Sequence, residues 1–129
     1  MWLKSNLEKE IISEFLPAGL LAHFSIVEVL KLGDVVSKKM FFEIYLEEHN
    51  EILGAVDKSQ YESKGFTEIT IQDFPIRGNA VFLKIKRRRW RHKDHPSEII
   101  RNDFSFVGEG SGFTRELSNF LKDRGRYKS

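Results

Sequence analysis

The side chains with the strongest chemical character are concentrated in one short stretch, residues 84–93 (the basic segment), which contains no acidic residue. Its cations are Lys84, Lys86, Arg87, Arg88, Arg89, Arg91 and Lys93. A row of cations favours contact with phosphates, because each neutralised phosphate releases condensed counterions. Trp90 lies among these cations and could stack on a base or an arginine, or could instead pack in a core. Arg77 is a weaker candidate for phosphate contact.

The basic segment directly follows the apolar residues 80–83, which predicts that a folded strand carries the charges. Seven phosphate contacts would give log affinity a slope against log salt of about −6, and four contacts a slope of about −4. The alternative is a solvated edge strand, on which lysine and arginine discourage edge-to-edge aggregation.

The charge is distributed unevenly along the chain. Residues 1–83 carry 8 Lys/Arg against 13 Asp/Glu, whereas residues 84–129 carry 13 against 6. The formal net charge of +2 therefore conceals an acidic part and a basic part. This asymmetry favours a polyanionic partner for the C-terminal third. An acidic surface on another protein would also fit.

The sequence predicts no catalytic centre, cofactor or small-molecule substrate. There are no cysteines, which excludes disulfides, thiol catalysis and cysteine-ligated zinc. His92 and His95 lie near Asp94, but no further clustered ligand accompanies them, so no metal site is expected. The carboxylates form no recognisable catalytic set, and Asp73 is expected to cap the turn that follows it. The glycine-rich residues 108–112 lack a lysine at phosphate-loop spacing.

Composition and periodicity predict a single α+β domain spanning residues 1–129. Helical spacing predicts helices within residues 1–24, the second over 18–24, and again over 113–124 with Gly125 as cap. Residues 25–107 are predicted to form an antiparallel meander of about five strands joined by turns. The expected strands are 25–30, 40–46, 66–71, 80–91 and 99–107. Neither a signal peptide nor a membrane-spanning run is recognised, so a soluble, cytoplasmic protein is expected.

Details of these strands carry further expectations. Residues 48–65 are expected to form a long loop, and residues 73–79 a tight connection with positive φ at Gly78 and Asn79. In the fourth strand, Val81, Leu83 and Ile85 should share one face, opposite Lys84, Lys86 and Arg88.

Several blocks resemble the N-terminal region of bacterial insertion-sequence transposases, in the ISAon-type branch related to the ISL-three class of DDE transposases. The resemblance covers nearly the whole chain, including residues 16–29, 44–50, 61–66 and 113–121. Its most specific part is Asp-Phe-Pro-Ile-Arg-Gly at 73–78, followed by Arg-Arg-Arg-Trp at 87–90.

The resemblance implies a zinc-ribbon-like strand arrangement that is metal-free here, because this chain has no cysteine. The recognition helix and the DDE nuclease domain of that family are not found in this sequence, so strand cleavage is not expected. The implied function is binding of double-stranded DNA at the transposon ends. The alternative is a protein-interaction module that docks a separately encoded nuclease part of the transposase.

Overall fold

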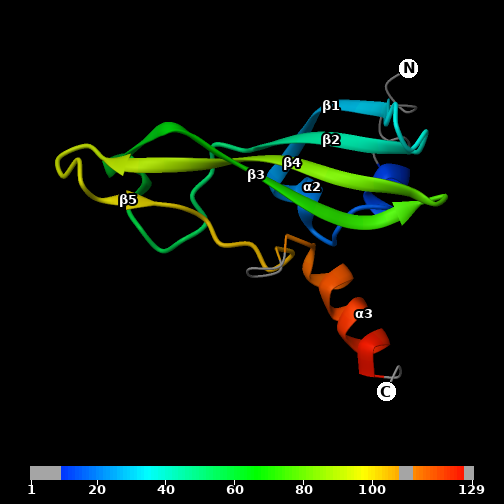
Figure 1. Cartoon of the computed structure of the whole chain (residues 1–129). Helices are drawn as coiled ribbons and strands as arrows, with labels where there is room; N and C mark the ends of the chain where they lie inside the picture. The colour runs from blue at the N-terminus through cyan, green and yellow to red at the C-terminus, as the bar shows by residue number, and fades with distance from the viewer. Residues whose placement is uncertain (1–9, 108–111, 127–129) are drawn as a thin grey trace.

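The structure is a computed structural model that describes residues 10–107 and 112–126, excluding the side chains of residues 125 and 126. Its elements are a helical segment at 10–14, α2 (Leu20–His23), β1 (Phe24–Gly33), β2 (Met40–Glu48), η1 (Lys58–Gln60), β3 (Tyr61–Ile76), β4 (Asn79–His92), β5 (Ile99–Ile100) and α3 (Arg115–Arg126). The arrangement confirms the expected α+β class (Figure 1). The beginning of the first predicted helix lies outside the described residues.

The sheet has the strand order β1-β2-β4-β3, and the short β5 pairs with β4. β1 and β2 form the expected antiparallel pair, and β3 and β4 form a second one. β2 and β4 are parallel, so the sheet is mixed where a wholly antiparallel meander was expected. β3 is an edge strand, and the chain then returns as β4 between β3 and β2 (Figure 1). The basic segment thereby lies on the central strand.

One face of the sheet carries the hydrophobic core, as the alternation in β4 predicts. Val81, Leu83 and Ile85 are each at most 1% exposed. They pack with side chains from the neighbouring strands, the N-terminal helices and the segment before α3: Leu16, Leu20, Phe24, Ile44, Leu46, Ile71 and Phe106. The opposite face of the sheet, called the open face below, carries the polar side chains of β2, β3 and β4. This division decides where each cation of β4 is placed.

The β3–β4 hairpin is longer and tighter than expected. β3 begins at Tyr61 and ends at Ile76. It is therefore longer than the strand predicted over 66–71, and the loop before it is shorter than the one predicted over 48–65. The turn has positive φ at Arg77 (53°) and Gly78 (77°), where Gly78 and Asn79 were expected. A two-residue hairpin turn of type I′ requires positive φ at both central residues. Arg77 is therefore held at the end of the hairpin, exposed to solvent.

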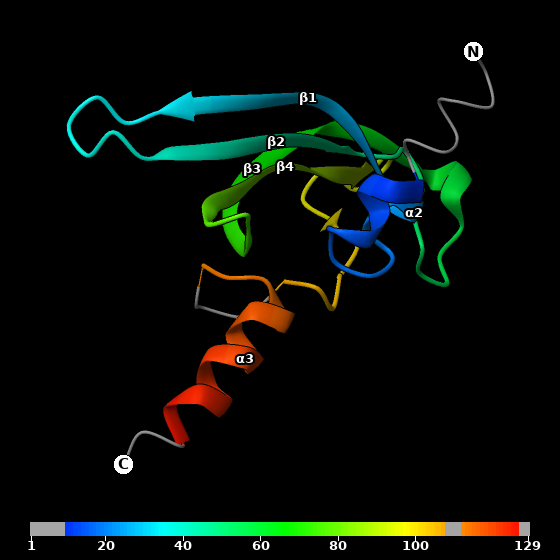
Figure 2. The same ribbon diagram turned by 90° about the vertical axis from the view of Figure 1, so that its right-hand side faces the viewer.

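Two C-terminal elements also differ from expectation. The predicted fifth strand contains only Ile99 and Ile100, because Phe104 and Phe106 pack their rings against Phe24 in the core. α3 starts two residues later than predicted and continues through Gly125, which is not its cap. Before it, the Thr114 hydroxyl accepts the Leu117 N–H at 3.3 Å. α3 extends away from the sheet (Figure 2).

Candidate nucleic-acid interface

Lys84 and Lys86 project from the open face between two strands that carry carboxylates. Lys84 Nζ lies 3.6 Å from Glu43 of β2, and Lys86 Nζ lies 3.9 Å from Glu68 of β3. The Glu43 carboxylate also accepts the Tyr45 hydroxyl at 2.8 Å, a hydrogen bond that raises the pKa of the tyrosine. Both lysines therefore have acidic partners within the chain, which the composition of the basic segment alone did not indicate.

Arg88 and Arg91 are paired as well. A guanidinium nitrogen of Arg88 lies 3.8 Å from Glu47, and another donates to Ser63 Oγ at 2.8 Å. The same guanidinium lies over the Phe66 ring, 4.6 Å from its centroid. Arg91 reaches Glu62 of β3 at 3.4 Å. Four of the seven cations of the basic segment therefore meet carboxylates of this chain.

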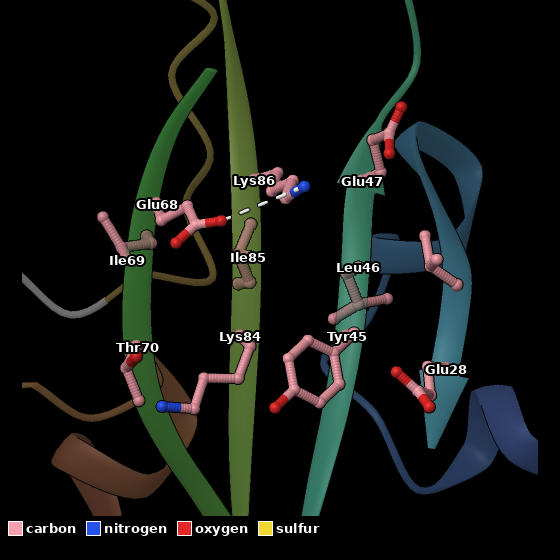
Figure 3. A pocket seen from close by; sticks show the side chains of 11 residues that line it. Glu28, Tyr45, Leu46, Glu47, Glu68, Ile69, Thr70, Lys84, Ile85 and Lys86 are labelled. Atoms are coloured by element: carbon pink, nitrogen blue, oxygen red, sulfur yellow. Dashed lines mark ion pairs between the residues drawn. The ribbon is translucent and has the colours of Figure 1, made fainter. Parts of the chain in front are cut away.

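Charge on the open face is consequently close to balanced. A hollow of about 430 Å³ on this face is bordered by Glu28, Glu47 and Glu68 around Lys84 and Lys86 (Figure 3). Lys86 reaches toward Glu68 across the strand boundary (Figure 3). A polyanion approaching this hollow would meet three carboxylates and two ammonium groups. Lys84 and Lys86 could therefore contact phosphates only by giving up these ion pairs.

Arg87 and Arg89 lie on the other face of β4 and, unlike Arg91 on that same face, have carbonyl oxygens as partners. We call them the arginine pair. Arg87 donates to the Asn102 carbonyl at 2.6 Å, and Arg89 to the Lys64 carbonyl at 3.4 Å. Among the described residues, neither guanidinium pairs with a carboxylate, and the Nε of each is buried without a hydrogen-bond partner. The Nε–H groups are buried, but each guanidinium has five N–H groups and each side chain is partly exposed, so Nη donors remain for an external anion.

A β-bulge in β3 positions Arg89. The register between β3 and β4 shifts between Ser63 and Phe66, where Gly65 has a φ of 93°. A Cβ at Gly65 would lie 3.6 Å from Arg89 Nη2, so the guanidinium packs along this glycine. A positive φ strains any residue with a side chain, which explains the glycine. The glycine was visible in the sequence, but its contact with Arg89 was not.

Trp90 is buried and cannot serve as the exposed stacking side chain considered from the sequence. It is 2% exposed, and its Nε1–H donates to Asn50 Oδ1 at 2.8 Å. The neighbouring His92 is also buried, and its ring nitrogens contact Gln60 and the Asp94 N–H. Within residues 10–107 and 112–126, no group of three or more His, Asp or Glu side chains is arranged to hold a metal ion. Lys93 and Arg77, the remaining candidates, are exposed.

Glu48 is a buried carboxylate that periodicity did not single out. It is 2% exposed at the end of β2. One carboxylate oxygen accepts the backbone N–H of Arg88 at 2.9 Å, and the other accepts Asn102 Nδ2 at 2.7 Å. Asn102 also accepts the Leu53 N–H and holds Arg87 through its carbonyl. Glu48 therefore fixes the part of β4 from which the arginine pair projects.

Asp73 connects β3 to the start of α3, where a turn cap was expected. It is 3% exposed and accepts the Thr114 hydroxyl at 2.9 Å. Burial raises the pKa of its carboxyl above the ordinary 3.8, although hydrogen bonds from Phe74 and Thr114 act in the opposite direction. Because β3 continues to Ile76, Asp73 lies within the strand and not at the start of a turn.

Replacing Asp73 by asparagine is expected to change how stability depends on pH. Because the folded-state pKa of Asp73 is raised, its contribution to stability is complete below 3.8 and is lost as pH rises through the folded pKa. The free energy of unfolding of Asp73→Asn, relative to the unmodified chain, should therefore increase from acidic to neutral pH. Urea unfolding at a series of pH values measures this difference. Asp57→Asn should give the opposite sign, because hydrogen bonds from Ser59 lower the pKa of Asp57. A pH-independent difference for Asp73→Asn would contradict the assignment.

No protein-family model, curated protein sequence or solved structure gives a significant match to this chain. The resemblance to insertion-sequence transposases therefore stays a prediction from the sequence blocks. No helix in the described part of the chain is long and apolar enough to cross a membrane.

Proposed function

We propose that this chain is a DNA-binding module, the N-terminal region of an insertion-sequence transposase, which contacts the ends of the element without cleaving them. The observation that carries this proposal is the arginine pair: two guanidiniums that share one face of a strand, with carbonyl oxygens as their protein partners. Free N–H donors on a fixed strand suit phosphate oxygens. Lys93 and Arg77 add exposed cations at the two ends of β4.

The paired cations reduce the expected number of phosphate contacts. Lys84, Lys86, Arg88 and Arg91 already face carboxylates, and releasing them would cost those ion pairs. The four remaining candidates predict a slope of log affinity against log salt of about −4 at most. Such binding positions the protein on the duplex and carries no information about base sequence.

Replacing the arginine pair is expected to weaken DNA binding more than replacing the paired lysines. Arg87→Gln/Arg89→Gln should make the salt slope shallower by about 2, because two phosphate contacts are lost. Lys84→Gln/Lys86→Gln removes the same charge from the open face and should leave the slope nearly unchanged. Fluorescence anisotropy of a labelled duplex, titrated at several salt concentrations, measures both slopes.

A further double variant keeps this test independent of folding defects. Arg87→Lys/Arg89→Lys retains the charge and should restore most of the slope but not the full affinity, because lysine lacks the guanidinium fork. If Arg87→Gln/Arg89→Gln and Lys84→Gln/Lys86→Gln reduce the salt slope equally, net charge alone determines binding. The absence of salt-dependent binding at low ionic strength would refute the proposal.

A protein-interaction module is a second candidate, and an apolar groove near the N-terminus favours it. The groove is lined by apolar side chains, including Phe15 and Val29, which are 59% and 52% exposed. Large exposed apolar surfaces are typical of binding sites. If DNA binding is absent while the product of a neighbouring nuclease-encoding frame co-purifies with the chain, this second function is favoured.

A further inference from the structure

The tip of the β1–β2 hairpin, residues 34–39 (the hairpin tip), presents two adjacent apolar side chains to solvent. Val35 is 91% exposed and Val36 is 92% exposed. The two strands extend beyond the rest of the sheet and carry this tip away from the body (Figure 2). Single exposed apolar residues are ordinary on protein surfaces. Two β-branched residues together at the apex of a turn are different, because turns favour glycine, asparagine, aspartate and serine.

Hydrogen bonds within the turn hold the valines in one conformation. Asp34 Oδ1 accepts the Val36 N–H at 2.9 Å, an interaction that is the largest cause of the lowered pKa of Asp34. The Asp34 carbonyl accepts the Lys38 N–H at 2.8 Å, and the Lys39 carbonyl accepts the Asp34 N–H at 2.9 Å. A fixed turn loses little conformational freedom on binding. The valines are therefore presented on a preorganised support.

Three exposed cations lie at the same end of the sheet as the two valines. Lys38 and Lys39 follow them in the turn, and Arg77 occupies the β3–β4 turn at the same end of the sheet. Among the described residues, none of these three side chains lies within ion-pairing distance of a carboxylate. A cleft of about 800 Å³ between the two turns is lined by Lys38 and Lys39 and also by Asp34. This end of the sheet thus combines three cations and the Asp34 carboxylate with two exposed valines.

We propose that the hairpin tip enters the major groove of duplex DNA, where Val35 and Val36 contact thymine methyl groups and Lys38 and Lys39 contact the flanking phosphates. This inference rests on the proposed DNA-binding function and assigns to the hairpin tip the base contacts that the arginine pair does not make. The major groove is about 12 Å wide and admits a two-stranded β-ribbon. Its base edges include the thymine methyl, which apolar side chains recognise.

A lipid bilayer is the alternative partner for the hairpin tip, because it also combines an anionic surface with an apolar interior. The apolar area at the hairpin tip is small for that purpose, because even a single myristoyl chain gives only marginal membrane binding. Two valine side chains bury less apolar surface than such a chain. The major groove requires only a few methyl contacts between two rows of phosphates, which matches the size of the tip and the positions of its lysines.

The test compares two duplexes of about 21 base pairs, two helical turns, which differ only in that deoxyuridine replaces every thymidine. Removal of the thymine methyls should weaken binding by the unmodified chain about fourfold for each methyl contacted. Val35→Thr/Val36→Thr keeps the β-branched shape and replaces a methyl by a hydroxyl in each side chain. It should bind the thymidine duplex more weakly and show a smaller difference between the duplexes, because one of the two methyls of each side chain is lost. Val56→Thr, at a partly exposed valine in another loop, should behave like the unmodified chain.

The possible results distinguish a failure of this inference from a failure of the proposed function. Salt-dependent binding that is equal for both duplexes, or a difference that is undiminished in Val35→Thr/Val36→Thr, overturns the groove contact and leaves DNA binding intact. An absence of binding to either duplex overturns both. Phosphatidylserine vesicles provide a further arm: vesicle binding that depends on the valines, with no effect of the valines on DNA binding, assigns the hairpin tip to a lipid surface instead.

Discussion

Replacing Trp90 by alanine should lower the free energy of unfolding by about 3–5 kcal/mol, the largest effect expected for any substitution in the basic segment. The side chain is 2% exposed, so its truncation leaves a cavity as well as losing the transfer free energy of the indole. It also removes the hydrogen bond to Asn50, which belongs to the loop after β2. Urea unfolding followed by circular dichroism measures the loss.

Trp90→Phe separates packing from nucleic-acid contact. Phenylalanine retains most of the apolar volume and loses the indole N–H, which should cost about 1 kcal/mol for the hydrogen bond plus a small packing term. Because a buried indole cannot stack on a base, the folded Trp90→Phe chain should bind DNA with unchanged affinity. A folded variant with clearly weaker DNA binding would place Trp90 in contact with a base, against its burial in the structure.

Replacing Glu48 by alanine is expected to cost about 3 kcal/mol of stability, because two buried N–H donors lose their acceptor at once. These donors are the backbone N–H of Arg88 and one N–H of the Asn102 side chain. Glu47→Ala is the matched control on the neighbouring residue. Its carboxylate is 39% exposed and pairs with Arg88 at 3.8 Å, so its loss should cost about 1 kcal/mol or less. Denaturant midpoints of the two variants measure the contrast.

Hydrogen exchange adds a local readout for Glu48→Ala. The Arg88 amide should lose protection beyond the global loss of stability, because its acceptor is the Glu48 carboxylate. The stability of Glu48→Gln should lie between those of Glu48→Ala and Glu47→Ala, because the amide oxygen can still accept a hydrogen bond from one of the two donors. If Glu48→Ala and Glu47→Ala are equally stable, the carboxylate of Glu48 does not support β4 in the way described.

Local patterns predicted the elements that they encode directly. The alternation of Val81, Leu83 and Ile85 with Lys84 and Lys86 fixes which side chains share a face of β4, because the side-chain period of a strand is two residues. The amphipathic spacing before Arg124 likewise predicted α3 to within two residues at each end. The turn at Arg77 and Gly78 was predicted one residue too late, since both Gly78 and Asn79 tolerate positive φ and the sequence does not choose between registers.

The candidate site was only partly predictable. The sequence located every cation of the basic segment, yet it gave no indication that Glu43 and Glu68 would lie beside Lys84 and Lys86. Those carboxylates belong to β2 and β3, and their proximity depends on the strand order and on the parallel pairing of β2 with β4. Strand order is a property of the whole chain, and no local pattern specifies it.

The sequence by itself determined the concentration of positive charge on one strand, the helical ends and the faces of the strands, because these follow from neighbouring residues. Only the tertiary structure decided which of the cations are free. By inserting β4 between two carboxylate-bearing strands it neutralised the open face, and it left Arg87 and Arg89 with carbonyl partners on the other face. The physical reason is that an ion pair needs two groups within a few ångströms, and here the folding of distant segments sets that distance.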